Sequence, residues 1–335
     1  MSAANTLPPV LALTMGDVNG VGPEILAKAL SRPEPWRWCR PVVFGSVRAL
    51  DEARRFAPDC PPPVAVDDVA AALMVEEAVP VLEWGHPGPV PQPGVLDPAA
   101  GAAAVVWIEA AVREAMAKRI AGMVTCPISK ACIIQAGCAH TGHTTLIAAM
   151  TGALDYRMCL FTDTLRIVHI TAHLSLRNAV SMVRKDRVLR SIEIADAALR
   201  RMGMTRPRVA VAALNPHAGE GGTFGREEID EIAPAVEAAR DKGIDCSGPW
   251  PPDTVFRRMQ DGAFDVVVAM YHDQGHIPLK LIAMDEGVNV TLGIPIVRTS
   301  VDHGTAFDIA GTGAAREHSL CAAISMAAQL TGWAG

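Results

Sequence analysis

Three histidines stand directly after apolar runs of the sequence, where buried strands would end. They are His173, His217 and His272, and the runs that they close begin at Arg166, Val209 and Val266. Imidazole is the commonest neutral metal ligand, and three protein ligands with one open position is the usual arrangement around a catalytic divalent ion. We therefore predict that the three rings share one metal ion. The alternative is that each ring is a polar strand-end group bound to backbone or water. His169 lies within its run and is expected to be a buried, hydrogen-bonded histidine, although it rivals His173.

A second set of residues could bind a phosphate or carboxylate. Gly142-His143-Thr144 precedes a stretch, Leu146–Met150, that could be helical, and a helix N-terminus favours anions. Thr144 would look the same as a simple helix cap. Further polar residues interrupt or end apolar segments, namely Lys280, Asn289 and Arg298. A buried cation needs a partner, which a bound anion or an internal salt bridge would provide.

Two further segments are rich in glycine or polar groups. Thr299–Thr305 suits a cofactor or substrate loop, with Asp302 and Thr305, together with Asn289, as candidate cofactor contacts. Asn215–Gly225 is a turn in which backbone N–H groups could approach an anion. Neither a G-x-G-x-x-G fingerprint nor a Walker A loop occurs, so any nicotinamide must be held by a scaffold other than the Rossmann one.

The elements that position these residues alternate between short apolar strands and longer helices. Such alternation predicts an α/β protein with mostly parallel, buried strands. The expected strands are Leu11–Met15, Val42–Phe44, Met123–Cys126, Arg166–Thr171, Arg208–Leu214 and Phe264–Met270. The expected helices are Glu24–Leu30, Ala99–Arg119 behind a cap at Asp97, Lys185–Met202 and Glu227–Lys242. The proline-rich stretch Ala57–Pro98 is expected to hold loops and edge structure.

The bulk composition excludes several classes of protein. The chain has 335 residues, half of them apolar, and a formal charge of -6 without a basic stripe, so we expect no nucleic-acid partner. No apolar run approaches the ~20 residues that a membrane span needs, and Met1–Pro9 does not resemble a signal peptide. Eight cysteines without a C-x-x-C pair suit reduced thiols in the cytoplasm.

Taken in order, these segments resemble the 4-hydroxythreonine-4-phosphate dehydrogenase family. The resemblance extends from Leu11 almost to the end of the chain and rests on several short motifs. They are Met15–Glu24, Thr125–Lys130, Gly142–Thr144, Asn215–Gly222, Tyr271–Gly275, Gly287–Gly293 and Arg298–Thr305.

The resemblance implies an isocitrate/isopropylmalate dehydrogenase-like fold of two α/β/α domains with a cleft between them. The first domain would comprise residues 1–130 and 300–335. The second, residues 131–299, would carry most metal and substrate residues and the interface of a homodimer. The implied metal ligands are His173, His217 and His272, in a site shared between subunits. The implied substrate contacts are His143, Thr144, Lys280, Asn289 and Arg298.

The implied reaction is the NAD- or NADP-linked oxidation of 4-hydroxythreonine 4-phosphate, followed by decarboxylation, as in vitamin B6 biosynthesis. A divalent ion such as Zn, Mg or Co would assist, and Lys280 or Asp273 would move the proton. This chain has Thr145 where members of the vitamin pathway often have Glu. It also has His276-Ile277-Pro278, which is more similar to the branch acting on D-threonate or D-erythronate 4-phosphate. Competing hypotheses are a metal-dependent hydrolase or aldolase, and a non-catalytic binder of phosphorylated ligands.

Overall fold

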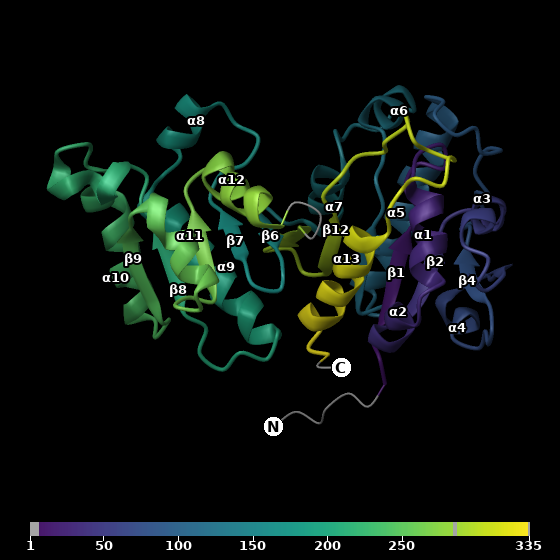
Figure 1. Cartoon of the computed structure of the whole chain (residues 1–335), viewed down its shortest axis with the longest axis horizontal. Coiled ribbons are helices and arrows are strands. Elements are labelled where there is room, and N and C mark those ends of the chain that lie inside the picture. The colour runs from purple at the N-terminus through teal and green to yellow at the C-terminus, as the bar shows by residue number, and fades with distance from the viewer. Residues whose placement is uncertain (1–6, 284–286, 334–335) are drawn as a thin grey trace. The chain divides into compact units, whose positions relative to one another are not determined.

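The computed structural model describes residues 7–283 and 287–333, which form two compact α/β units (Figure 1). Unit 1 comprises Met1–Leu154 together with Ile294–Gly335, and unit 2 comprises Asp155–Gly293. The first unit is therefore built from both ends of the chain. No helix within the described ranges is long and apolar enough to cross a membrane.

The division differs from the expected one at both boundaries. Residues 131–154 and 294–299 belong to unit 1, although they were assigned to the second domain. The physical reason for the first difference is helix packing, because α6 (Lys130–Gln135) and α7 (His143–Thr151) pack against α5 (Pro98–Met116) of unit 1. His143, Thr144 and Arg298 consequently lie in unit 1.

The sheet of unit 1 is entirely parallel, with strand order β3-β4-β2-β1-β5-β12. Its strands are β1 (Val10–Thr14), β2 (Arg40–Phe44), β3 (Pro63–Ala65), β4 (Val79–Leu82), β5 (Gly122–Thr125) and β12 (Val297–Val301). Strands β4, β5 and β12 are buried along their whole length, as expected for a parallel sheet with helices packed on it. The stretch expected to be loops and edge structure thus contains a fully buried strand, β4.

Helices of unit 1 pack against this sheet from several parts of the chain. Helix α5 contacts β1, β2 and β5 and begins at Pro98, where the carboxylate of Asp97 accepts a hydrogen bond from the backbone N–H of Ala99. This confirms the predicted cap. Helix α13 (His318–Leu330) packs on β12 and β5 and also contacts α1 (Gly22–Leu30), which is visible in Figure 1 as the yellow helix beside the purple one. The remaining helices are α2 (Pro33–Trp38), α3 (Val47–Ala53), η1 (Arg54–Phe56) and α4 (Val69–Ala72).

The sheet of unit 2 is mixed, with strand order β11-β6-β7-β10-β8-β9. Strand β6 runs antiparallel to both β11 and β7, whereas the other neighbours pair in parallel. Its strands are β6 (Arg157–Phe161), β7 (Arg166–His169), β8 (Val209–Ala212), β9 (Cys246–Trp250), β10 (Val266–Ala269) and β11 (Val288–Leu292). Parallel strands β7, β10 and β8 therefore end at the same edge of the sheet.

The helices of unit 2 include α9 (Lys185–Arg201) and α10 (Ala233–Asp241), which pack together, and α12 (His272–Ala283), which contacts β7 and β10. The helix expected over Glu227–Lys242 begins with a π-helical turn, Glu228–Ile232, before α10. The other helical segments are α8 (Leu176–Ser181), η2 (Pro216–Gly222) and α11 (Pro252–Gln260).

Candidate functional site

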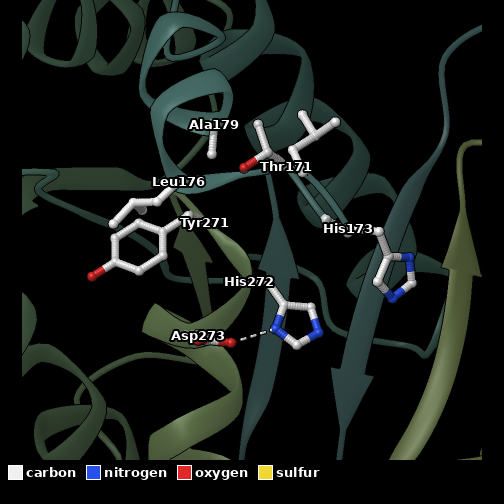
Figure 2. Close-up of a pocket in the computed structure, with 9 residues that line it drawn as sticks. Thr171, His173, Leu176, Ala179, Tyr271, His272 and Asp273 are labelled. Atoms are coloured by element: carbon white, nitrogen blue, oxygen red, sulfur yellow. Dashed lines mark hydrogen bonds and ion pairs between the residues drawn. The ribbon is translucent and has the colours of Figure 1, made fainter.

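His173 and His272 lie together at the carboxyl edge of the unit 2 sheet. Their ring centroids are 5.6 Å apart, and both rings line a cavity of about 250 Å³ that also includes Thr171, Tyr271 and Asp273. Figure 2 shows the two rings facing the same open space, with Asp273 bonded to His272. Two of the three predicted metal ligands thus converge within one chain.

Hydrogen bonds between neighbouring strand ends hold this pair in place. After β7, the backbone N–H of Ile170 donates to the carbonyl of Ala269 at 2.8 Å, and the hydroxyl of Thr171 donates to the carbonyl of Met270 at 3.0 Å. The buried amide of Gln274 accepts from the Met270 N–H and donates to the carbonyl of Ala213, each at 2.7 Å. The start of α12 is therefore fixed to both neighbouring strand ends.

The carboxylate of Asp273 sets the tautomer of His272. Its Oδ1 lies 2.7 Å from Nδ1 of His272, and a carboxylate only accepts, so Nδ1 carries the proton and Nε2 carries the lone pair. A ring whose nitrogen binds zinc at about 2.1 Å has its centroid about 3 Å from the ion, so two such rings near the tetrahedral angle stand roughly 5 Å apart. The observed 5.6 Å between His173 and His272 fits two ligands of one ion.

His217 is placed on a separate, strained turn. Residues 217–221 all have positive φ, including the non-glycine residues His217 (φ 53°), Ala218 (φ 55°) and Glu220 (φ 44°), and His217 is exposed. Such conformations are costly and concentrate at functional sites. Within residues 7–283 and 287–333, no three His, Cys, Asp or Glu side chains gather as a metal site. Among the residues described, His217 of the same chain therefore does not join His173 and His272 in a three-ligand site.

The buried carboxylate of Glu228 anchors this left-handed turn. Its Oε1 accepts hydrogen bonds from the backbone N–H groups of Leu214 and Asn215, each at 2.8 Å, and its Oε2 accepts from Nδ2 of Asn215 at 2.9 Å. Gly219 has no Cβ, and a Cβ there would lie 2.6 Å from Oε2 of Glu228. The turn and its anchor are therefore packed too closely for a side chain at Gly219.

Two further histidines adjoin the pair. His169 is 1 % exposed, and its Nδ1 lies 3.1 Å from the carbonyl of Met158, as predicted for a buried histidine. Burial and the neighbouring His276 lower the pKa of His169 to about 3, so its ring is neutral. His276 was noted in the sequence only as a departure from a family pattern. Its spacing of four residues from His272 was the signal that a helix would place both on one face.

Arg298 is buried near the start of β12 in the unit 1 sheet, and its guanidinium reaches the last residue of β5. It lies on β12 opposite Met123 of β5, and its Nη2 donates to the hydroxyl of Thr125 at 2.8 Å. Arg298 is 3 % exposed, and burial lowers its pKa to about 10, which leaves the guanidinium charged at neutral pH. A buried charge of this kind suits an anionic ligand.

His143 begins helix α7 of unit 1, next to Thr144. Its Nε2 is inaccessible to solvent and has no hydrogen-bond partner among the described residues. Burial, and then the positive charge of Arg298, hold the pKa of His143 well below its usual value. The cap residue Gly142 supplies no side-chain hydrogen bond, so the first turn offers donors to a ligand. These features suit a phosphate or carboxylate.

The remaining candidates are divided between the units. Lys280 lies on α12 and Asn289 on β11, where the side-chain oxygen of Asn289 is buried without a partner among the residues described. Asp302 follows β12, and the carbonyl of Thr305 accepts a hydrogen bond from Val21 at 3.0 Å. Thr305 thus contacts the turn that precedes α1.

Asp17 is a buried titratable residue that was not among the candidates predicted from the sequence. It is fully buried in the turn after β1, where its Oδ1 accepts from the backbone N–H of Asn19 at 3.0 Å. Burial raises the pKa of Asp17 to about 6, and the nearby charge of Asp97 adds to this effect. A lone aspartate in a glycine-rich turn gives no sequence signal of such burial.

Comparison with known proteins gives consistent matches over nearly the whole chain. Residues 37–327 match the family model described as pyridoxal phosphate biosynthetic protein PdxA. The chain is 44% identical to a D-threonate 4-phosphate dehydrogenase of Pectobacterium atrosepticum, with 96% of this chain and 99% of the relative covered. It is 47% identical to a 4-hydroxythreonine-4-phosphate dehydrogenase of Desulfosudis oleivorans, with 95% of each covered.

Solved structures agree with this similarity. A 4-hydroxythreonine-4-phosphate dehydrogenase from Klebsiella pneumoniae superposes with a TM-score of 0.85 at 41% identity, covering 96% of this chain and 99% of that one. A terephthalate 1,2-cis-dihydrodiol dehydrogenase from Burkholderia xenovorans is more distant, with a TM-score of 0.71 at 33% identity, covering 96% and 98%. The α/β fold predicted from the sequence is confirmed.

Proposed function

Because the chain belongs to the pyridoxal phosphate biosynthetic protein PdxA family, we propose that it is an NAD(P)-linked, metal-assisted dehydrogenase that oxidises and then decarboxylates a small phosphorylated hydroxy acid. The first candidate substrate is 4-hydroxythreonine 4-phosphate, which would give an amino-ketone phosphate and carbon dioxide in vitamin B6 biosynthesis. The observation that carries the proposal is the convergence of His173 and His272, with Asp273 fixing the metal-binding tautomer of His272.

D-threonate 4-phosphate is the second candidate, with D-erythronate 4-phosphate as its close variant. The names of several relatives favour it, including the one from Pectobacterium atrosepticum, and so does the segment His276-Ile277-Pro278. D-Threonate 4-phosphate carries a hydroxyl at carbon 2 where 4-hydroxythreonine 4-phosphate carries an amine. The bond changes are otherwise shared: hydride leaves carbon 3, the carboxyl group departs as carbon dioxide, and carbon 2 gains a proton.

His173, His272 and a third imidazole would hold the metal, as the spacing and tautomer of the first two rings permit. A divalent ion at this position would lower the pKa of the substrate hydroxyl and balance the negative charge left by decarboxylation. The nicotinamide ring, when bound, accepts the hydride. Asp273 keeps the His272 ring oriented. Because its carboxylate already accepts the hydrogen bond from Nδ1 of His272, we assign delivery of the proton at carbon 2 to Lys280.

The phosphate is proposed to contact Arg298, His143 and Thr144 of unit 1. Arg298 is a buried cation held by Thr125, and the first turn of α7 presents unsatisfied N–H groups beside the neutral ring of His143. Lys280 and Asn289 of unit 2 are proposed to contact the rest of the substrate. The nicotinamide cofactor contacts proposed from the sequence are Asn289, Asp302 and Thr305.

The partner is proposed to be a second copy of the chain, whose His217 completes the metal site. The exposed position of His217 supports this, as do large apolar side chains exposed on the same unit near the candidate ligands. These are Leu174 (48 % exposed), Leu176 (61 %) and Phe224 (52 %). The reaction is proposed to take place in the cytoplasm, which suits eight free cysteines.

A substrate panel tests the reaction. The purified protein is incubated with a divalent metal and with 4-hydroxythreonine, threonate or erythronate 4-phosphate, each with NAD and with NADP. Absorbance at 340 nm and release of carbon dioxide should rise together for at least one pair. A hydrolase or aldolase would consume substrate without absorbance at 340 nm, and a non-catalytic binder would show stabilisation without turnover.

Ligand variants test the metal centre. His217→Ala and His272→Ala should each lower NADH formation by orders of magnitude and release bound metal, because the site loses a ligand. His318→Ala, on an exposed histidine of unit 1, is the matched control and should retain both. Full activity of the two ligand variants after chelator treatment would exclude the proposed metal role.

A further inference from the structure

A row of three imidazoles leads from strand β7 to His272. His276 lies one helical turn after His272 on α12, and the two rings stack with centroids 3.5 Å apart and planes inclined by 12°. His276 Nδ1 lies 3.2 Å from His169 Nε2, and the carbonyl of Met158 lies 3.1 Å from the other nitrogen of His169. The face of the His272 ring is therefore covered by a ring that is itself tied to the sheet.

The proton positions in this row follow from the carbonyl at its end. A carbonyl only accepts, so Nδ1 of the neutral His169 ring donates to Met158 and its Nε2 holds a lone pair. That lone pair must accept a proton from Nδ1 of His276, which also approaches the backbone carbonyl of His272 at 3.1 Å. Each hydrogen bond in the row thus has one direction, and the backbone of β6 sets it.

The helix reaches His169 only because residue 275 is glycine. A Cβ on Gly275 would lie 2.5 Å from His169 Nε2 and 2.7 Å from Cγ2 of Ile167. The backbone conformation of Gly275 needs no glycine, since no positive φ occurs there. Close approach of α12 to β7 is therefore what the glycine provides, and it places His276 within reach of His169.

We infer that His169 and His276 are positioning residues that hold the plane of the His272 ring, so that its Nε2 lone pair keeps a fixed direction toward the metal. Asp273 fixes the same ring at its edge, through Nδ1. A ligand held both at its edge and on its face loses little freedom on binding, and residues behind metal ligands commonly contribute 10–100-fold to metal affinity. This inference rests on the proposed metal site.

The test compares cobalt binding by the full-length metal-free protein and its variants. His276→Phe keeps an aromatic ring on His272 but removes the donor to His169, and His169→Phe removes the acceptor. Each should weaken the cobalt Kd, measured by chelator competition, by about tenfold or more and shift the visible absorption of bound cobalt. The double variant should bind about as weakly as His276→Phe alone, because the contact between His276 and His169 is already lost in that variant.

Controls separate positioning from folding. His318→Phe, the same substitution on an exposed histidine, should leave the cobalt Kd unchanged. Thermal unfolding of the metal-free proteins checks the fold. If the buried His169→Phe variant does not fold, His276→Phe decides alone, since His276 is only partly buried.

Two outcomes would overturn the inference. If the wild type binds cobalt but folded His276→Phe binds within twofold of it, with an unchanged spectrum, the positioning role is wrong while the metal site stands. If the wild type binds no cobalt, the proposed metal centre fails and the positioning role fails with it.

Discussion

Asp17 is a residue whose charge is unfavourable in the folded protein. Its pKa rises from 3.8 to about 6 through burial, which corresponds to roughly 3 kcal/mol. Between about pH 4 and pH 6 the folded state keeps a proton on Asp17 that the unfolded state has lost, so the contribution of Asp17 to stability should fall as pH rises through this window and level off above it.

Asp17→Asn should remove this pH dependence. The amide oxygen can still accept from the N–H of Asn19, so the turn is preserved. We expect the variant to be more stable than the wild type by roughly 1–3 kcal/mol at pH 7.5 and about equal to it near pH 4, measured by urea unfolding. Asp59→Asn, on an exposed aspartate, is the control. A difference that is the same at both pH values would contradict the burial argument.

Arg298 tests the proposed phosphate contact. Arg298→Lys keeps a positive charge but loses the planar fork that can bind Thr125 and an anion together. The KM for the phosphorylated substrate should rise at least tenfold. The KM for the nicotinamide cofactor should change much less, and the two constants are measured under the same conditions. A lower unfolding temperature with unchanged KM would instead mean that Arg298 is structural.

At the scale of elements, the buried carboxylate of Glu228 holds the start of the left-handed turn of residues 217–221. Glu228→Gln replaces one acceptor oxygen with an amide that cannot accept from Nδ2 of Asn215. Nδ2 of Asn215 keeps its hydrogen bond to Glu227 but loses the one to Glu228. We expect a loss of roughly 1–3 kcal/mol in the free energy of unfolding, because a hydrogen bond to a charged group is lost. Glu237→Gln on the exposed face of α10 is the control, and thermal unfolding measures both. Equal effects of the two substitutions would show that Glu228 does not anchor the turn.

Local patterns predicted the elements that local chemistry determines. The cap at Asp97 and the strands β1, β7 and β10 follow from capping residues and apolar runs, and all were predicted near their observed bounds. The antiparallel pairing of β6 with β11 was missed, because pairing direction depends on distant partners rather than on either sequence. The π-helical turn at Glu228 was not predicted for a similar reason, because Glu228 bonds to the distant backbone of Leu214 and Asn215.

The candidate site was also predictable only where it follows from the order of elements along the chain. His173 and His272 follow two parallel strands, β7 and β10, that end at the same edge of the sheet, so their convergence could be expected from order along the chain. The stacking of His276 on His272 required knowing that α12 begins at His272 itself. In our proposal His217 binds the metal ion of a second subunit. The sequence of one chain does not show how two subunits pack together.

At the scale of the whole molecule, mixing two inactive variants tests the shared site. If His217 reaches the metal of the partner subunit, a hybrid of His217→Ala and His272→Ala subunits rebuilds one of its two sites. Half of randomly formed dimers are hybrids, so the mixture should recover about a quarter of wild-type activity. Subunits are exchanged by co-refolding, and activity is followed at 340 nm.

The hybrid experiment needs two controls. Each variant refolded alone should remain inactive, and sedimentation should show the same dimer for every sample. If a mixture that contains hybrid dimers recovers no activity, the shared site is wrong. Either all three histidines then bind the metal within one subunit, or one of them is not a ligand.

Unit 1 is assembled from two distant parts of the chain, and this has a consequence for biosynthesis. Its sheet takes strand β12 beside β5, and its core takes helix α13, from residues that the ribosome makes after all of unit 2. All of unit 2 is translated earlier and can fold as soon as it emerges, whereas β5 must wait with one edge uncovered. A nascent chain stalled when Gly293 has just left the ribosome should therefore resist protease within unit 2 and be cleaved within the residues that precede it.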